Sequence, residues 1–209
     1  MKISYAVTVC NELVEIQRLL PFLIEKKRQE DEIIIFYDSN NGSKAVDEYL
    51  RSLSSNTFAP FRCIHYHFDG HFANMKNALT EACLGDYIFQ IDADEIPHEN
   101  LINSLPGLLE ENQIIDMIRV PRVNTVEGLT EEHIKKWGWN VNEKGWVNWA
   151  DWQMRIYKNT PEVRWVNKVH EVLDGFKNHG MLPAEEEWAL YHPKDIQRQE
   201  KQNSYYSTL

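Results

Sequence analysis

Three carboxylate residues follow an apolar run in the segment FQIDADEIP, residues 89–97, namely Asp92, Asp94 and Glu95. In an extended backbone, residues two positions apart point the same way, so Asp92 and Asp94 can face one site. Carboxylates this close repel one another unless a cation lies between them. Mg²⁺ in proteins is typically held by one or two carboxylates together with substrate phosphates. The pattern therefore predicts a divalent cation that carries a nucleotide diphosphate, whereas the same triplet on an ordinary turn would only be solvated.

The surrounding sequence places these carboxylates at the end of a buried strand. Apolar runs predict strands at residues 3–9, 31–39, 61–69 and 86–95. Helical spacing predicts helices between them at residues 13–29, 44–55 and 72–84, the first with a kink or break at Pro21. This alternation predicts an α/β fold with a Rossmann-like, mostly parallel sheet flanked by helices. Ligands bind at the carboxyl ends of such strands, so the loops at residues 10–12, 38–43 and 92–95 should meet at one rim.

The second half of the chain has a less regular pattern. A helix is expected at residues 98–112, a strand at 114–123 and a polar helix at 196–207, with short strands and turns between 153 and 195. No repeat, low-complexity segment or clear linker divides the chain. A single domain over residues 1–209 is therefore expected.

Composition argues against several classes of protein. The 22 basic and 32 acidic residues give a formal net charge of −10, which disfavours general nucleic-acid binding. The three cysteines are odd in number and far apart, so no disulfide framework is expected. No apolar run approaches a membrane span and the N-terminus lacks a signal pattern, so a cytoplasmic location is expected.

Several motifs, taken in order, resemble family-2 glycosyltransferases. They are AVTVCNE at 6–12, IIIFYDSNNGS at 33–43, FANMKNALTEACLGDYIFQIDADEIP at 72–97, WADWQMRIYKN at 149–159 and VHEVLDG at 169–175. Within that family, the run GWVNWADWQMRIY, the His170–Glu171 pair, LYHPKD and EKQNSYY are similar to lipopolysaccharide-core enzymes of the β-glucosyltransferase type. The resemblance covers nearly the whole chain. It implies the glycosyltransferase A fold, in which residues 1–97 bind a nucleotide sugar and residues 98–209 form an acceptor-side half, with a small antiparallel region and a C-terminal tail.

The resemblance also implies a nucleotide-sugar donor, Mg²⁺ or Mn²⁺, and inversion at the anomeric carbon. A UDP-sugar is the first candidate for the donor, and a carbohydrate or glycolipid for the acceptor. Asp94 is expected to bind the metal, and Asp92 to approach the metal or the ribose. Lys76 stands where the family often has an arginine. The residues expected to bind the donor are Val9, Glu12, Asp38, Asn74, Lys76, Asn77 and Asp92.

Inverting transfer requires a base that takes the proton of the attacking hydroxyl, and positive charge on the departing diphosphate. Asp151 is the first candidate for the base and Glu171 the second, although either carboxylate could instead be structural. Arg155 could contact donor phosphates or pair with a nearby carboxylate. His192 could bind the metal or a phosphate, or be an ordinary surface histidine.

Clustered tryptophans invite two interpretations. Trp139, Trp146, Trp149 and Trp152 could stack on sugar rings, but core positions are expected for most of them, with one or two at an acceptor rim.

Three other functions remain open. Cys63, His65, His67 and His71 could bind zinc, which would make the protein a zinc enzyme or a metal-binding module. A nucleotidyltransferase uses a similar sheet, but the first loop lacks the glycine-rich, basic sequence typical of that class. A non-catalytic relative would bind a sugar nucleotide or a partner protein. A homodimer and peripheral contact with the inner membrane face are further expectations for the transferase.

Overall fold

The computed structural model describes residues 1–54 and 60–206 of the 209-residue chain. The strands are β1 (Ile3–Val9), β2 (Glu32–Asp38), β3 (Arg62–Tyr66), β4 (Tyr87–Asp92), β5 (Ile96–Pro97), β6 (Met117–Glu127), β7 (Val147–Lys158), β8 (Arg164–Val166), β9 (Val172–Asp174), β10 (His179–Met181) and β11 (Leu190–Asp195). The helices are α1 (Leu13–Lys26), α2 (Lys44–Ser54), α3 (Phe72–Ala82), α4 (Glu99–Glu111), α5 (Glu131–Trp137), the 3₁₀ turn η1 (Glu186–Trp188) and α6 (Ile196–Tyr206).

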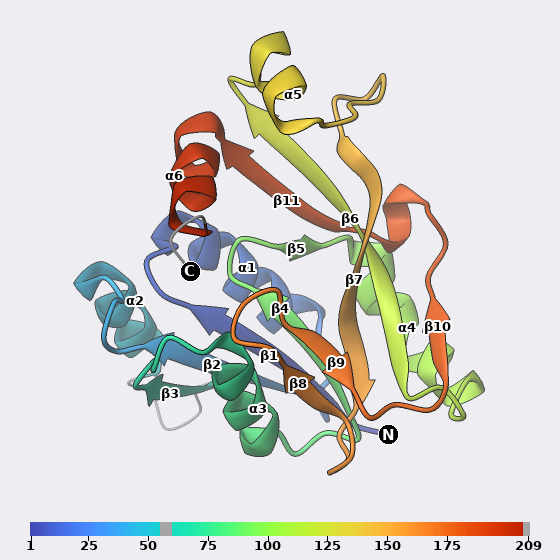
Figure 1. Cartoon of the computed structure of the whole chain (residues 1–209). Helices are drawn as coiled ribbons and strands as arrows, with labels where there is room; N and C mark the ends of the chain where they lie inside the picture. The colour runs from blue at the N-terminus through green and yellow to red at the C-terminus, as the bar shows by residue number, and fades with distance from the viewer. Residues whose placement is uncertain (55–59, 207–209) are drawn as a thin grey trace.

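Nine of these strands form one mixed sheet with the order β3-β2-β1-β4-β7-β6-β11-β5, and β10 pairs with β6 (Figure 1). The first four strands in this order are parallel, with Val7 opposite Ile35 on one side and Ile91 on the other. β7 runs antiparallel to β4 and β6, and β11 runs parallel to β6. The predicted α/β fold with a mostly parallel sheet and an antiparallel second part is confirmed.

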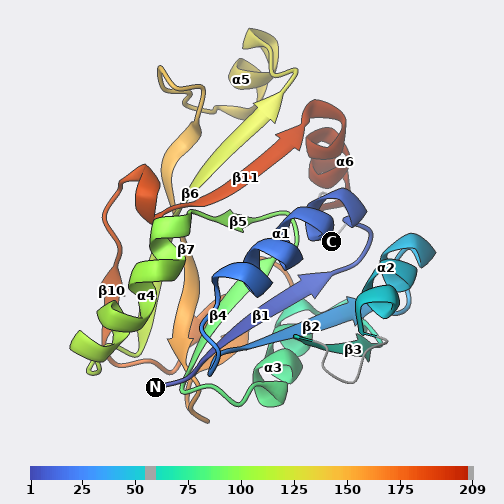
Figure 2. The same cartoon turned by 180° about the vertical axis from the view of Figure 1, so that it is seen from behind.

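Alternation along β1 sends side chains to two separate cores. Ile3, Tyr5 and Val7 face a core covered by α1, α2 and α4, whereas Ala6 faces a core under α3 and the β8–β9 pair. Figure 1 shows α3 and β8–β9 in front of the sheet, and Figure 2 shows α1 and α4 in front of the opposite face. Helices therefore cover both faces of the parallel part.

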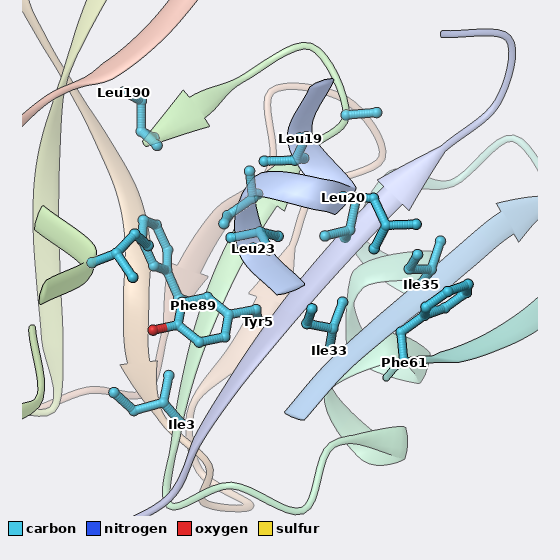
Figure 3. Close-up of a cluster of buried hydrophobic side chains, with 14 of the residues drawn as sticks. Ile3, Tyr5, Leu19, Leu20, Leu23, Ile33, Ile35, Phe61, Phe89 and Leu190 are labelled. Carbon is cyan, nitrogen blue, oxygen red and sulfur yellow. The ribbon is translucent and has the colours of Figure 1, made fainter. Parts of the chain in front are cut away.

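The helix α1 is the main cover of the first core. Its residues Leu19, Leu20 and Leu23 are almost completely buried over the sheet, where Figure 3 shows them beside Ile33. The break predicted at Pro21 does not occur, because α1 continues from Leu13 to Lys26. Burial of the leucines on both sides of the proline outweighs the hydrogen bond that proline cannot donate.

Two predicted strands have different bounds in the structure. The strand expected at 114–123 runs from Met117 to Glu127, and that expected at 61–69 ends at Tyr66. Ser55 and Ser207, the last residues of two predicted helices, lie outside the described residues. Within the described residues, no helix combines the length and apolar character needed to cross a bilayer.

Candidate active site

The carboxyl ends of β1, β2 and β4 meet at one rim, as the sequence predicts. The backbone N–H of Ser43, after β2, donates a 3.1 Å hydrogen bond to the carbonyl of Cys10, after β1. The hydroxyl of Thr8 on β1 donates a 3.0 Å hydrogen bond to Asp92 on β4. The acidic segment 92–95 therefore lies beside the first loop, and elements from the second half of the chain complete the site.

The carboxylate of Asp92 is surrounded by donors from β1, α3 and β7. One oxygen accepts the hydrogen bond from Thr8 and lies 3.6 Å from the Lys76 ammonium, and the other lies 2.6 Å from a guanidinium nitrogen of Arg155. Burial alone would raise the pKa of Asp92, but the charges of Arg155 and Lys76 outweigh burial and hold that pKa far below its usual value. Asp92 is ionised at neutral pH, and much of its charge is already compensated.

Glu95 is the fully buried member of the cluster. One of its oxygens accepts hydrogen bonds from Arg155 at 2.6 Å and from Arg122 at 3.0 Å, and the other accepts a 3.2 Å bond from the backbone N–H of Asp92. Breaking the ion pairs of a buried carboxylate that lies between two guanidinium groups strongly destabilises the folded protein. Glu95 therefore fixes the turn after β4. Arg155 is also buried and pairs with both carboxylates, which is the structural alternative considered for it.

Asp151 lies inside β7, not ahead of the strand as the sequence suggested, because β7 starts at Val147. One of its oxygens accepts two hydrogen bonds from Arg122, at 3.0 and 2.7 Å, and one from Asn124 at 2.9 Å. The other oxygen accepts a 2.7 Å bond from Gln153. Burial would raise the pKa of Asp151, but the neighbouring Arg122 charge and these hydrogen bonds lower it.

A chain of polar contacts connects Asp151 to Asp94 through Asn124 and His192. Because ionised Asp151 can only accept, Asn124 must present its NH₂ group to Asp151 and its carbonyl oxygen to the Nδ1 of His192, 2.7 Å away. Burial lowers the pKa of His192, so the neutral ring donates from Nδ1 and carries a lone pair on Nε2. That Nε2 lies 3.3 Å from a carboxylate oxygen of Asp94. A lone pair facing an ionised carboxylate is unfavourable unless a cation lies against both.

A cation does approach this pair, from the C-terminal helix. A guanidinium nitrogen of Arg198 on α6 lies 3.2 Å from the same Asp94 oxygen. The guanidinium also contacts Glu15 at 2.5 Å and Glu12 at 3.4 Å, both from α1 or the loop before it. Arg198 thus joins the C-terminal helix to the acidic rim.

A cavity of about 260 Å³ lies on the other side of His192. Its walls come from β6, β7, β11, α6 and the loop after α5, and they include Asp151, Asn124, His192, Trp139 and Gln199. Amide groups, one carboxylate and one aromatic face suit a hydroxylated ring. The candidate base and the candidate metal ligand therefore share one small polar cavity.

Glu171 reaches the site through Lys76. The buried ammonium of Lys76 lies 2.6 Å from Glu171, 3.6 Å from Asp92 and 4.7 Å from the centre of the Trp165 ring. Glu171 precedes β9, directly after His170, whose φ is 52°. Lys76 thus lies beside Asp92, and Glu171 is its counter-ion.

The donor-binding candidates at the ends of β1 and β2 mostly support their own loops. Val9 is buried at the end of β1. The carboxylate of Glu12 accepts hydrogen bonds of 2.8 and 3.0 Å from the backbone N–H groups of the two preceding residues, and burial raises its pKa. Asp38 is buried and accepts backbone hydrogen bonds of 2.9 and 3.2 Å from residues two and three positions later.

The two asparagines of α3 point to different partners. Both amide atoms of Asn77 bond the backbone of Trp165, at 2.8 and 2.9 Å, and so fasten β8 to α3. The exposed Asn74 donates a 2.7 Å hydrogen bond to Asp69. No contact described for either residue joins it to Asp92, unlike Lys76 on the same helix.

The histidine and cysteine cluster of the zinc hypothesis does not form a site. Among the described residues, no three His, Cys, Asp or Glu side chains have the arrangement of a metal centre. His65 lies 3.1 Å from Asp47, and the ring of His71 accepts a hydrogen bond at the start of α3. Because β3 ends at Tyr66, His67 does not continue the strand alternation that was expected to align it with Cys63.

The prediction that most of the four clustered tryptophans are core residues is wrong. Trp139, Trp146 and Trp149 are half-buried, and Trp152 is 37% exposed. The segment between α5 and β7, which carries Trp139 and Trp146, extends beyond the layers that cover the parallel part of the sheet (Figure 1), whereas Trp149 and Trp152 lie in β7 itself. Trp139 lines the 260 Å³ cavity, whereas Trp146 and Trp149 line a separate open groove.

Comparison with known proteins decides the family. The sequence model described as Glycosyl transferase family 2 matches residues 4–173. The chain belongs to glycosyltransferase family 2. No curated protein sequence matches it. The narrower likeness to lipopolysaccharide-core enzymes stays a prediction.

Solved structures show that this family-2 glycosyltransferase has the glycosyltransferase A fold. S. aureus TarS 1–349 in complex with UDP-GlcNAc matches with a TM-score of 0.66 and 13% identity, over 93% of this chain and 59% of that chain. The complex of TarS 1–349 with UDP matches with a TM-score of 0.65 and 12% identity, over 92% and 60%. A further TarS crystal structure gives 0.64 and 13%, over 92% and 37%. The chain thus spans less than two thirds of the TarS chains.

Sequence reasoning missed three residues of this site. Arg122 and Asn124 alternate on β6 and face Asp151 across the strand pair, and Arg198 comes from the last helix. The i, i+2 spacing of Arg122 and Asn124 was the one available signal, since it places two polar side chains on a strand face whose other residues, Ile118, Val120 and Val126, are apolar.

Proposed function

We propose that the chain transfers a sugar from a nucleotide-sugar donor to an acceptor hydroxyl, with inversion, and that Mg²⁺ or Mn²⁺ assists. The proposal is carried by the convergence of Asp94 and His192, whose facing ligand atoms are 3.3 Å apart at the sheet rim. Membership of family 2 and a likeness to TarS, which was solved with UDP-GlcNAc and with UDP, support a UDP-sugar donor.

The carboxylate oxygen of Asp94 suits Mg²⁺ or Mn²⁺, and the imidazole nitrogen of His192 suits Mn²⁺ better than Mg²⁺. Two adjacent ligands of an octahedral Mg²⁺ lie about 3.0 Å apart, since each metal–ligand bond is about 2.1 Å. The 3.3 Å separation of Asp94 and His192 is close to this value. The described residues hold no preformed group of three ligands, which suits a cation that relies on substrate phosphates and water for its other positions.

Each residue then has one task. Asp94 and His192 would hold the cation, which would neutralise charge on the departing diphosphate. Asn124 fixes the ring of His192 so that Nε2 faces Asp94. Lys76, beside Asp92, adds positive charge at the donor side of the rim. Glu12 and Asp38 support the loops after β1 and β2, through which the nucleoside would bind.

Asp151 is proposed as the base. It lines the same cavity as His192, so an acceptor hydroxyl in that cavity can lie between the carboxylate and the donor. Its pKa is lowered, which keeps it ionised and ready to accept a proton over the whole neutral range. Glu171 is the second candidate, but its 2.6 Å ion pair with Lys76 favours a role on the donor side.

A nucleotide screen tests the proposed function. We expect one of UDP-, GDP-, CMP- and dTDP-sugars to raise the melting temperature, and the shift to require Mn²⁺ or Mg²⁺. Asp94→Asn should remove the cation-dependent part of the shift, whereas Glu81→Asn, at an exposed position of α3, should keep it. No shift with any nucleotide, with or without cation, would contradict the proposal.

A further inference from the structure

The helix α6 contacts both the cation site and the 260 Å³ cavity. Arg198 contacts Asp94, the proposed cation ligand, while the next residue, Gln199, lines the cavity. In Figure 1, α6 stands at the end of β11, the strand that carries His192, on the side where β1 and β2 end. One helix therefore touches both the donor side and the proposed acceptor side of the site.

Arg198 makes the main polar contacts of α6 in the part of the helix whose side chains the structure describes. None of those described side chains is buried. Three carboxylates converge on Arg198, from Glu12, Glu15 and Asp94. A weaker contact of 3.7 Å joins Glu200 to His133 on α5.

A divalent cation at Asp94 would compete with this arrangement. The guanidinium of Arg198 lies 3.2 Å from the Asp94 oxygen that faces His192 at 3.3 Å. A cation bound there would take the lone pair that Arg198 now contacts, and two positive groups a few ångströms apart repel each other. Arg198 would lose one of its three carboxylate partners and meet a repulsive neighbour.

We propose that α6 is a cation-released lid: Arg198 stands in for the metal at Asp94 and holds α6 as one wall of the cavity, and cation binding frees the helix and widens the cavity for an acceptor. The inference rests on the proposed function for its cation, whereas the contact between Arg198 and Asp94 is present in the structure itself. The acceptor would then enter only after the cation and the donor have bound. Before that, the closed helix would limit the access of water to the site.

Hydrogen exchange of α6 tests the lid, with Mn²⁺ as the probe. We expect Mn²⁺ to accelerate exchange of the α6 amides about fivefold, the effect of losing one ion-pair contact. Arg198→Gln should exchange this fast without Mn²⁺, and should bind Mn²⁺ several-fold more tightly when free Mn²⁺ is followed by electron paramagnetic resonance. Arg51→Gln is the matched control, because Arg51 forms an exposed ion pair with Asp47 on α2; it should behave as wild type.

Three results would overturn the lid. The first is unchanged α6 exchange in metal-free Arg198→Gln, which removes the latch whatever the metal does. The second is tight Mn²⁺ binding by the wild type with no change in α6 exchange. The third is failure of every variant to bind Mn²⁺, which removes cation release and the metal from the proposed function together. Nucleotide binding is then measured without metal. Binding would show that only the metal is excluded, whereas no binding would also contradict the proposed sugar transfer.

Discussion

Arg122 donates two hydrogen bonds, of 3.0 and 2.7 Å, to a single carboxylate oxygen of Asp151. Burial would raise the pKa of Asp151, and the guanidinium charge is the main influence that lowers it. A base acts only when ionised, so activity should be present above this pKa and be lost as pH falls through it. Arg122 thereby extends the active range of the proposed base toward acid.

Loss of the Arg122 charge should therefore narrow the active pH range. In Arg122→Met the acidic limb of kcat should move to higher pH by about one unit. Arg122→Lys keeps the charge and should move the limb less, although lysine lacks the two-pronged geometry. The measurement is a pH profile of donor turnover for the three proteins. An acidic limb that stays in place in Arg122→Met would mean that Asp151 is not the titrating base.

Substitutions of the two candidate bases should differ in their effect on donor affinity. Asp151→Asn should lower kcat by about three orders of magnitude while donor affinity stays within about twofold, because a lost base affects the chemical step. Glu171→Gln should weaken donor affinity as well, because Lys76 would lose its closest partner, at 2.6 Å. Release of nucleotide from the donor, together with calorimetric donor binding, measures both quantities. The reverse pattern would assign the base to Glu171.

Asn77 should matter for stability and not for the donor. Its amide NH₂ donates to the backbone carbonyl of Trp165, and its amide oxygen accepts from the backbone N–H of the same residue. Asn77→Ala leaves both backbone groups unpaired and should lower the free energy of unfolding by about 1–3 kcal/mol. Asn74→Ala, at an exposed position of the same helix, should cost less than about 0.5 kcal/mol. Urea unfolding measures both. A large loss of donor affinity in a stably folded Asn77→Ala would restore the donor role inferred from the sequence.

A carboxylate far from the rim should make stability depend on pH. Asp116 accepts hydrogen bonds from the Lys158 ammonium at 2.9 Å and from the backbone N–H groups of Asn178 and Lys177 at 2.9 and 3.0 Å. The Lys158 hydrogen bond, with these backbone donors, lowers the pKa of Asp116 to about 2. Because the folded pKa lies below the unfolded value of about 3.9, the stabilisation is complete above the unfolded value and disappears as pH falls toward 2.

Asp116→Asn should therefore destabilise the protein at neutral pH by about 1 kcal/mol, a figure that allows for solvent screening of a partly exposed pair. The difference from wild type should shrink as the pH of the urea titration is lowered from 7 toward 3. Glu81→Gln, an exposed carboxyl on α3, should show no such difference. A cost that is the same at both pH values would show that the hydrogen-bond geometry matters more than the charge.

The parallel part of the fold could be predicted because its signals are local. Apolar runs and helical spacing in the first hundred residues alternate, and connection rules leave few ways to arrange such units. The rim followed directly, since parallel strands end on one side. That is why the position of Asp92 and Asp94 at the rim could be predicted from the sequence pattern, whereas Lys76 was named only through the family resemblance.

The remaining residues of the site depend on distant pairs that no local pattern encodes. Asn77 meets Trp165 across 88 positions and Arg198 meets Asp94 across 104. The prediction of buried tryptophans failed because aromatic content predicts burial only where another layer covers the strand. Asp151 was found by its motif, but its partners on β6 depend on an antiparallel pairing with register shifts.

The central claim is that Asp94 and His192 together hold the cation that carries the donor diphosphate. Pulsed electron paramagnetic resonance of Mn²⁺ bound with UDP tests it directly, because an imidazole ligand couples its ¹⁴N nucleus to the metal. We predict a ¹⁴N coupling in the wild type that is absent in His192→Gln, and loss of Mn²⁺ binding in Asp94→Asn. A bound Mn²⁺ with no ¹⁴N coupling, in a wild-type protein whose UDP affinity is the same with and without metal, would contradict the account.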